Sequence, residues 1–191
     1  MALFVIGDTH LSLSCEKPMD VFGSRWDGYV EKLRDGWTRR VTPEDTVVIA
    51  GDISWAMTPA EAKADFDFLE QLPGKKIILK GNHDYWWQTK KKLDAFVEAN
   101  GYQTISFLHN NAYETDEFIL CGSRGWYTDD KNVTVRGADA ERSSRGNVVG
   151  SARVFRAAEN CVTRRAREAR KRKFSHFCIF RRSSRAISAT K

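Results

Sequence analysis

Short apolar runs alternate with amphipathic segments through the first half of the chain. The runs at residues 3–6, 46–50 and 76–80 are rich in β-branched and aliphatic side chains, which is typical of buried parallel strands. The apolar residues between positions 26 and 40 recur at helical spacing instead. This order of strands and helices predicts a βαβαβ arrangement, an α/β fold with a parallel sheet and right-handed crossovers.

Turn and capping residues set the limits of the later elements. A capping box, Thr58–Glu61 with proline at the first helical position, opens a second helix that Pro73-Gly74 ends. A third helix closes at Asn100-Gly101, where glycine supplies the left-handed C-terminal residue. Two further apolar runs, 105–108 and 118–121, predict two more strands.

The charge of the chain changes sign near residue 131. Residues 1–131 carry 15 Lys and Arg against 21 Asp and Glu, whereas residues 132–191 carry 16 against 4. In the second part, arginine and serine are frequent and the regular spacing of apolar residues is lost. We therefore expect one domain over residues 1–131, followed by a basic Arg/Ser-rich tail without a packed core of its own.

Two hypotheses explain the basic tail. As a native extension, clusters such as Arg170–Lys173 would neutralise phosphates and bind nucleic acid. Alternatively, residues 132–191 are the product of a shifted reading frame or a truncation. Their sequence is rich in arginine and has no apolar periodicity, whereas residues 1–131 are acidic and regularly patterned.

The sequence argues against a membrane-spanning protein and against a secreted, disulfide-linked one. No apolar run reaches membrane-spanning length, and the first residues lack the basic start and cleavage site of a secretory signal. The cysteines form no C-x-x-C pair and no disulfide framework. We expect a soluble cytoplasmic protein with free thiols.

Polar side chains follow each of the three predicted parallel strands. Asp8 and His10 come after the first, Asp52 after the second, and the stretch Gly81-Asn82-His83-Asp84 after the third. Because ligands bind outside the carboxyl ends of such strands, topology predicts that these groups converge.

The converging groups suit metal-assisted hydrolysis. Carboxylates, imidazoles and an amide oxygen favour Mn²⁺, Fe or Zn²⁺, and a carboxylate between two cations can bridge them. Asp52, on the middle strand of the three, is the candidate bridge. His83 is the candidate proton donor to a leaving group, with Asp84 expected to fix the tautomer of its ring.

These three motifs in this order resemble the calcineurin-like metallophosphoesterase superfamily, whose pattern is D-x-H, G-D-x-x-D, G-N-H-[DE], a lone His and G-H-x-H. The resemblance covers about residues 1–131 and includes a bacterial branch of predicted phosphohydrolases. It implies a layered α/β sandwich and two divalent metal ions. It also implies that Asp8 and His10 hold one metal, Asp52 bridges both and Asn82 holds the second, with His83 near the leaving group or phosphate.

The chain departs from the family pattern at two places. Trp55 stands at the last position of G-D-x-x-D, and no G-H-x-H follows. Beyond His83 only His109 and His176 remain, neither in a matching context. The C-terminal half of the family's fold is thus expected to be truncated or replaced, and the metal site to lack histidine ligands.

Other residues near the motifs keep two interpretations each. Arg124 could contact substrate phosphate or form a salt bridge at a strand end. Trp55, Trp86 and Trp87 could pack around the site or form a base-stacking platform, with packing favoured.

Three hypotheses for function follow. The first is a metal-dependent phosphoesterase, a phosphatase or phosphodiesterase acting on a phosphomonoester or phosphodiester and impaired by its missing ligands. The second is a nucleic-acid-binding protein that carries the basic tail on an inactive phosphoesterase scaffold. The third is an unstable fragment without function.

Overall fold

The computed structural model describes residues 1–17, 19–115, 118–123, 156–157, 175–182 and 185–186. The chain divides into two compact units, residues 1–107 and 108–191, each containing one four-stranded sheet. The predicted α/β fold class is confirmed, with its parallel sheet and covering helices in the first unit.

The first sheet is parallel throughout and follows the order of the chain. Its strands are β1 (Leu3–Ile6), β2 (Thr46–Ile49), β3 (Lys75–Ile78) and β4 (Ile105–Phe107), in the order β1-β2-β3-β4. The register pairs Ile6 with Ile49 and Ile49 with Ile78, so the first three strands end at the same level. The loops that follow them therefore start side by side.

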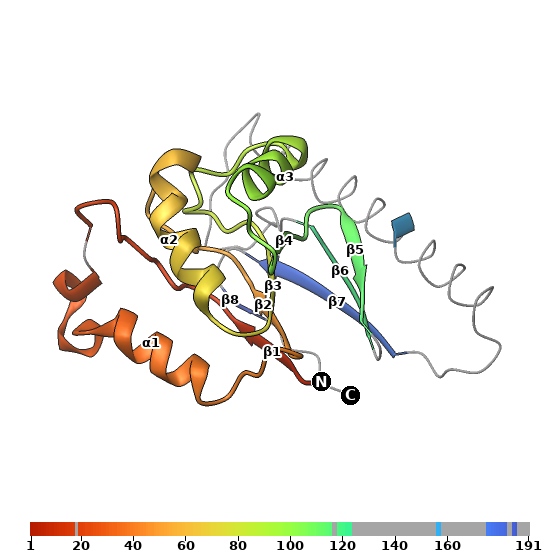
Figure 1. The fold of residues 1–191 in the computed structure, drawn as a ribbon, viewed down its shortest axis with the longest axis horizontal. Coiled ribbons are helices and arrows are strands. Elements are labelled where there is room, and N and C mark those ends of the chain that lie inside the picture. The colour runs from red at the N-terminus through yellow and green to blue at the C-terminus, as the bar shows by residue number, and fades with distance from the viewer. Residues whose placement is uncertain (18, 116–117, 124–155, 158–174, 183–184, 187–191) are drawn as a thin grey trace, which may run out of the picture. The chain divides into compact units, whose positions relative to one another are not determined.

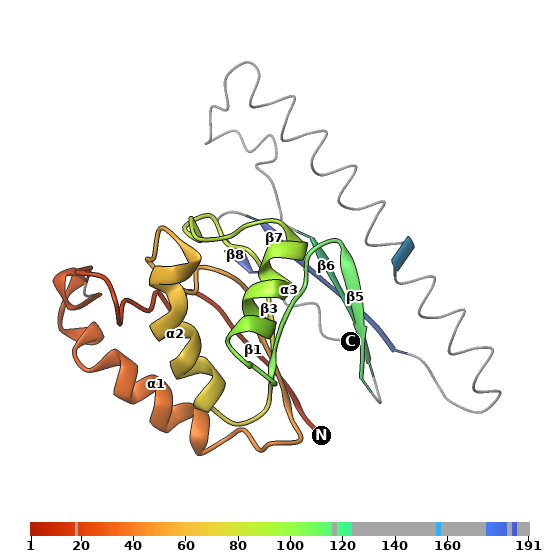
Figure 2. The same cartoon turned by 45° about the horizontal axis from the view of Figure 1, so that its top comes forward.

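Three helices cover one face of this sheet: α1 (Tyr29–Thr38), α2 (Pro59–Gln71) and α3 (Lys90–Ala99) (Figure 1). Right-handed crossovers between strands in sequential order bring every helix to the same side, as Figure 2 shows. The opposite face of the first sheet thus receives none of these helices.

The helix limits agree with the capping signals for α2 and α3. The Thr58 hydroxyl accepts the backbone N–H of Glu61 at 3.3 Å, with Pro59 as the first helical residue. The Glu61 carboxylate accepts the N–H of Met57, not that of Thr58 as in a regular capping box. Gly101 adopts φ 70° after α3, as its C-terminal glycine signal predicts.

The helix predicted over 26–40 is shorter than expected. A short 3₁₀ segment, η2 (Ser24–Trp26), comes first, and α1 begins only at Tyr29. Gly28 separates the two with φ 58°, a left-handed conformation that glycine adopts without steric cost. The apolar period continued through this break, so periodicity alone could not locate it.

Aromatic side chains fill the core between the helices and the sheet. The ring of Phe66 on α2 is fully buried and lies 5.0 Å from Trp86 and 5.4 Å from Phe96, centroid to centroid. Both contacts are edge-to-face, a favourable geometry for aromatic pairs. Trp86, one of the tryptophans with two interpretations, is 1% exposed and packs in this core.

A buried lysine ties the end of α2 to the sheet. The Lys76 ammonium on β3 donates to the carbonyl oxygen of Leu72, the C-terminal cap of α2, and to the Thr104 hydroxyl. Burial lowers the pKa of Lys76 to about 8, while the charge of Glu70 raises it. A cation at this position satisfies a helix-terminal carbonyl.

The second unit contains a separate sheet of four strands. These are β5 (Asn111–Glu114), β6 (Phe118–Ser123), β7 (Ser175–Arg182) and β8 (Arg185–Ala186), paired in that order. β5 and β6 are antiparallel, whereas β6 and β7 are parallel. The sequence predicted β6 but none of the other three.

Most of the predicted basic tail lies outside the described residues, and so does Arg124. Within residues 132–191 the structure describes strands β7 and β8, which the aperiodic composition did not suggest. Among the helices that the structure describes, none is long and apolar enough to cross a membrane.

The core packing predicts a large loss of stability for Phe66→Ala. Removing a fully buried aromatic ring should cost about 3–5 kcal/mol in the free energy of unfolding, measured by urea denaturation. Phe22→Ala is the matched control, because Phe22 is 63% exposed and its loss should change stability by about 0.5 kcal/mol or less. Equal shifts in the two variants would contradict the assignment of Phe66 to the core.

Candidate metal centre

The loops that follow β1 and β2 are joined by backbone hydrogen bonds. The N–H of Asp8 donates to the Gly51 carbonyl oxygen at 3.0 Å, and the N–H of His10 donates to the Asp52 carbonyl oxygen at 2.9 Å. These bonds continue the parallel pairing beyond the strands themselves. The backbone therefore holds Asp8, His10 and Asp52 next to one another.

Strained backbone accompanies these residues. Asp8, His10 and Asp52 have φ values of 57°, 44° and 52°, in the left-handed region that non-glycine residues seldom adopt. In the described part of the chain, Asn110 is the one other non-glycine residue with positive φ. Such strain concentrates at functional sites, where the surrounding structure holds it in place.

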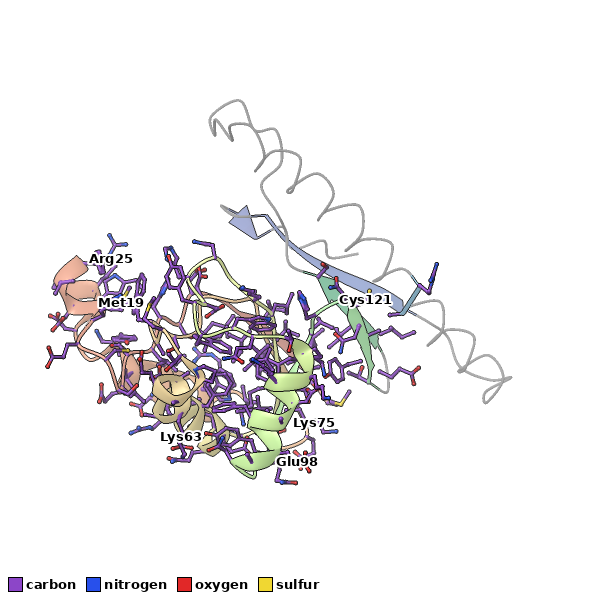
Figure 3. The ribbon with its side chains drawn as sticks, turned by 90° about the horizontal axis from the view of Figure 1, so that it is seen from above. Met19, Arg25, Lys63, Lys75, Glu98 and Cys121 are labelled. Carbon is purple, nitrogen blue, oxygen red and sulfur yellow. The ribbon has the colours of Figure 1, made fainter. Side chains whose placement is uncertain are left out.

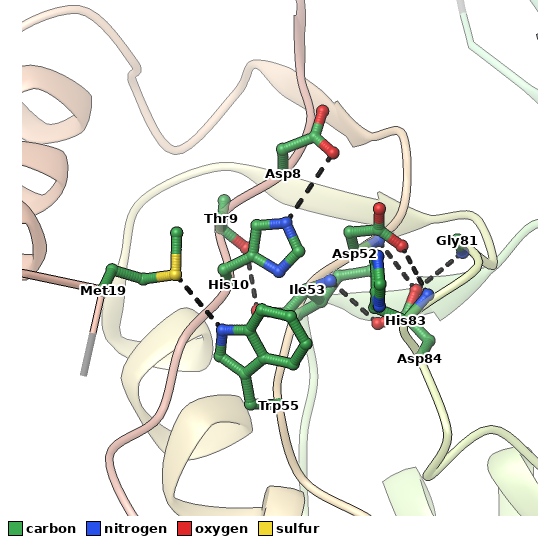
Figure 4. Close-up of polar contacts among 10 residues, drawn as sticks. All are labelled: Asp8, Thr9, His10, Met19, Asp52, Ile53, Trp55, Gly81, His83 and Asp84. Carbon is green, nitrogen blue, oxygen red and sulfur yellow. Dashed lines mark hydrogen bonds and ion pairs between the residues drawn. The ribbon is translucent and has the colours of Figure 1, made fainter. Parts of the chain in front are cut away.

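The side chains of these residues form a compact cluster (Figure 4). One carboxylate or imidazole atom from each of Asp8, His10 and Asp52 lies within 4.8 Å of the other two. The His10 Nε2 atom lies 3.9 Å from Asp8 Oδ1. Asp52 is 2% exposed, whereas Asp8 is exposed, so the cluster opens to solvent on the Asp8 side. Two carboxylates and an imidazole at this spacing can hold a divalent cation.

The loop after β3 joins the cluster through its main chain. The backbone N–H of His83 donates to Asp52 Oδ1 at 2.9 Å. This bond fixes the Asp52 carboxylate and places the His83 imidazole beside His10, with ring centroids 5.7 Å apart. Asn82 directly precedes His83 on this loop.

The Asp84 carboxylate holds the loops after β2 and β3 in place. Its Oδ2 atom accepts the backbone N–H groups of Asp52 at 2.8 Å and Gly81 at 2.6 Å. Its Oδ1 atom accepts the N–H of Ile53 at 2.8 Å and the indole N–H of Trp86 at 3.1 Å. The carboxylate is 1% exposed and binds the loops after β2 and β3 together.

Asp84 was expected to orient the His83 ring, and its contacts show a different arrangement. Both of its oxygens accept the N–H groups of other residues, and the His83 Nδ1 atom is buried without a hydrogen-bond partner in the described structure. While its carboxylate binds these N–H groups, the Asp84 side chain cannot also reach the His83 ring. Asp84 acts as a positioning residue.

Burial raises the pKa of the Asp84 carboxyl to about 6, and the nearby charge of Asp52 adds to this effect. The N–H groups of Gly81 and Ile53 act in the opposite direction, because they stabilise the carboxylate form. The group is thus charged at neutral pH. An anion is the form that can accept all of these bonds at once.

Trp55 forms a wall of the site. Its ring stacks on His10 at a centroid distance of 4.7 Å and an interplanar angle of 21°, and it lies 5.1 Å from His83. The indole N–H donates to the Met19 sulfur at 3.2 Å. The packing interpretation of Trp55 is the one that these contacts favour, and they put an aromatic ring against both imidazoles.

Two further residues, Asp65 and Tyr29, support these loops, and the sequence analysis missed them. The buried Asp65 on α2 accepts the Leu13 N–H at 2.8 Å and the Ser54 hydroxyl. The Tyr29 hydroxyl donates to the His10 carbonyl oxygen at 2.9 Å. Burial raises the pKa values of both Asp65 and Tyr29. An acidic residue on the apolar face of α2, three positions after Ala62, was the available signal.

The other candidate histidine ligands belong to the second unit. His109 lies in the second unit, before β5, where its backbone N–H donates to Asn111 Oδ1 at 2.6 Å. His176 lies on β7, opposite Ile119 of β6.

Comparison with known proteins agrees with the motif pattern. The family model described as calcineurin-like phosphoesterase matches residues 1–147. The chain is also similar to the uncharacterized protein MJ1445 of Methanocaldococcus jannaschii, with 26% identity over 113 residues. That alignment covers 56% of this chain and 58% of the relative, so the chain spans little more than half of the relative's length.

A solved structure is similar as well. It is the crystal structure of a protein of unknown function, AQ665 from Aquifex aeolicus, at 19% identity and a TM-score of 0.44. The match covers 75% of this chain and 71% of that one.

The contacts of Asp84 predict that Asp84→Asn destabilises the protein strongly. The substitution replaces one carboxylate oxygen by an NH₂ group. Two backbone N–H groups then face another donor and lose their acceptor, which should cost about 3 kcal/mol in the free energy of unfolding. Urea unfolding measures this loss.

Asp94→Asn provides the control, since Asp94 forms an exposed ion pair with Lys90. Its effect should stay below about 1 kcal/mol. If Asp84→Asn were as mild as its control, Asp84 could not be the residue that joins the two loops.

Proposed function

We propose, from the premise that the chain belongs to the calcineurin-like phosphoesterase family, that it hydrolyses a phosphomonoester or phosphodiester at the Asp8, His10 and Asp52 cluster. The observation that carries the proposal is the convergence of these three ligand atoms within 4.8 Å of one another. Family membership alone supports a phosphate-ester hydrolase. The closeness of these three side chains supports the cluster as the place where hydrolysis occurs.

The donor set fits a pair of divalent cations. Carboxylate and imidazole ligands suit Mn²⁺, Fe or Zn²⁺. Asp8 and His10 would hold one cation, Asn82 the other, and Asp52 both. Bound there, the cations would supply Lewis-acid polarisation of the phosphoryl group and a water of lowered pKa.

The position of Asp52 supports the bridging role. It follows β2, the strand between β1 and β3, so its side chain stands between the two loops that supply the other ligands. The bond from the His83 N–H to Oδ1 fixes the orientation of the carboxylate. An oriented carboxylate loses less conformational freedom when it binds a metal.

His83 is the proposed acid for the leaving oxygen. Its ring lies beside that of His10 and against Trp55. Its Nδ1 atom is buried without a hydrogen-bond partner in the described structure, which is a high-energy state for a polar atom. A substrate or water that bonds to the ring would satisfy it, and the ring could then transfer a proton.

The activity of this chain is proposed to be impaired. The family pattern supplies further histidine ligands after G-N-H-[DE], and the second part of this sequence carries no G-H-x-H. Fewer ligands give weaker metal binding. We propose that residues 1–131 form the N-terminal part of the phosphoesterase domain and that residues 132–191 replace the rest.

Asp52→Asn tests the location of the site. The amide keeps an oxygen that can accept the His83 N–H but removes the negative charge, so Mn²⁺ affinity should fall by at least about tenfold. Titration calorimetry with Mn²⁺ measures it, and Mn²⁺-dependent hydrolysis of bis(p-nitrophenyl) phosphate should fall in parallel. Asp94→Asn serves as the control. Unchanged Mn²⁺ affinity in Asp52→Asn would show that Mn²⁺ binds at another place.

The impairment has its own test. At the same sub-saturating Mn²⁺ concentration, turnover of bis(p-nitrophenyl) phosphate should be at least about tenfold lower for this chain than for a family member that carries G-H-x-H, because lost ligands weaken metal binding. Equal turnover would show that the G-H-x-H motif is dispensable or that other residues replace its histidines.

A further inference from the structure

The Trp55 indole contacts both imidazoles of the candidate metal centre. It stacks on His10 at a centroid distance of 4.7 Å and lies 5.1 Å from the ring of His83. The two imidazoles lie 5.7 Å apart, so the three rings form one cluster (Figure 4). The proposed chemistry uses both imidazoles and gives the indole no part.

Backbone pairing holds Trp55 next to His10. The N–H of Leu11 donates to the Ile53 carbonyl oxygen at 2.8 Å, and the N–H of Trp55 donates to the Leu11 carbonyl oxygen at 2.9 Å. These bonds extend the pairing that joins the loops after β1 and β2. His10 and Trp55 are thus attached to the same ladder of hydrogen bonds, and their backbones cannot separate without breaking it.

The indole has further contacts that do not involve His10. Its N–H donates to the sulfur of Met19, a buried residue that begins the 3₁₀ helix η1 (Met19–Phe22). Figure 3 shows Met19 close to Arg25 at this end of the first unit. The Lys17 ammonium lies over the indole, 5.6 Å from the ring centroid, where a cation–π attraction is favourable. These contacts hold the indole in one orientation.

An indole held in this way restricts the His10 ring. The planes of the two rings differ by 21°, so rotation about the bond between Cβ and the imidazole would lift the ring off the indole. The His10 side chain is 12% exposed, and the Tyr29 hydroxyl fixes its carbonyl group. In the stacked position Nε2 lies 3.9 Å from Asp8 Oδ1, so this nitrogen faces the other candidate ligands.

Stacking differs from the usual way of orienting a metal-binding imidazole. Such a ring normally donates its second N–H to a carboxylate or a carbonyl oxygen. Trp55 stands at the last position of G-D-x-x-D, where the family pattern has a carboxylate. An indole face accepts no such bond, but contact over the whole ring can fix the same orientation.

We propose that Trp55 is a positioning residue, which holds the His10 imidazole in its metal-binding orientation by stacking. This inference rests on the proposed function and adds a determinant of metal affinity outside the ligands themselves. A ring that is already oriented loses less conformational freedom when a metal binds. Metal affinity should therefore depend on an aromatic ring at position 55.

Two substitutions in the full chain separate the ring from the rest of the side chain. Trp55→Leu should weaken Mn²⁺ binding by at least about tenfold, measured by titration calorimetry, because His10 loses the surface on which it stacks. Trp55→Phe keeps a ring for stacking and should remain within about threefold of the parent chain. Both variants lose the bond to the Met19 sulfur, so the difference between them reports on the aromatic ring.

Phe68→Leu is the matched control. Phe68 is 5% exposed in the last turn of α2, and the Arg34 guanidinium lies over its ring. Its replacement also exchanges a packed aromatic ring for leucine and should lower the stability of the chain to urea. Mn²⁺ affinity should nevertheless stay within about threefold of the parent, because Phe68 lies outside the three-ring cluster.

Nuclear magnetic resonance of the metal-free chain gives a readout that general destabilisation does not move. The ring current of the indole should shift the C–H resonances of the stacked His10 ring upfield, and Trp55→Leu should return them downfield. His10→Gln identifies these resonances by their absence. Phe68→Leu should leave them in place.

The outcomes separate the two proposals. Parent-like Mn²⁺ affinity in Trp55→Leu would overturn the positioning role and leave the proposed function standing. Equal losses in Trp55→Leu and Trp55→Phe, an equal loss in Phe68→Leu, or His10 resonances that Trp55→Leu does not move would overturn it as well. Absence of Mn²⁺ binding by the parent chain would contradict the proposed function itself, and the role of Trp55 with it.

Discussion

Parallel pairing of β1, β2 and β3 at matched ends is the constraint on which the candidate site depends. Sequential right-handed crossovers bring the three helices to one face and the three strand ends to one edge. Backbone bonds from Asp8 and His10 to the loop after β2 then extend the pairing into the loops. Residues more than 40 positions apart in sequence become neighbours by this topology alone.

One buried carboxylate converts that proximity into fixed geometry. Asp84 holds the main chain of Asp52, Ile53 and Gly81, and it remains charged at neutral pH despite its burial. These bonds offset the left-handed strain at Asp52. The loop backbone is thus organised before any ligand binds, which reduces the entropy that metal binding would otherwise cost.

The sequence predicted the features that depend on local pattern or on ordered motifs. Apolar runs located β1, β2 and β3, and the motifs identified Asp8, His10 and Asp52 as residues that meet. The role of Asp84 could not be read in this way, since a carboxylate next to His83 suggests a contact with that ring, and only the fold shows the N–H groups around it. Asp65 and the stacking of Trp55 on His10 also depend on contacts between distant elements. Strands β7 and β8 lie in a composition that carries no periodic signal.

The central claim is that Asp8, His10 and Asp52 share a metal. Anomalous X-ray diffraction from crystals of the protein grown with Mn²⁺ tests it most directly. The account predicts an anomalous peak at about 2.0–2.3 Å from one side-chain atom of each of these residues, the ordinary range for such ligands. A Mn²⁺ peak bound elsewhere, with these three side chains apart from it, would contradict the account.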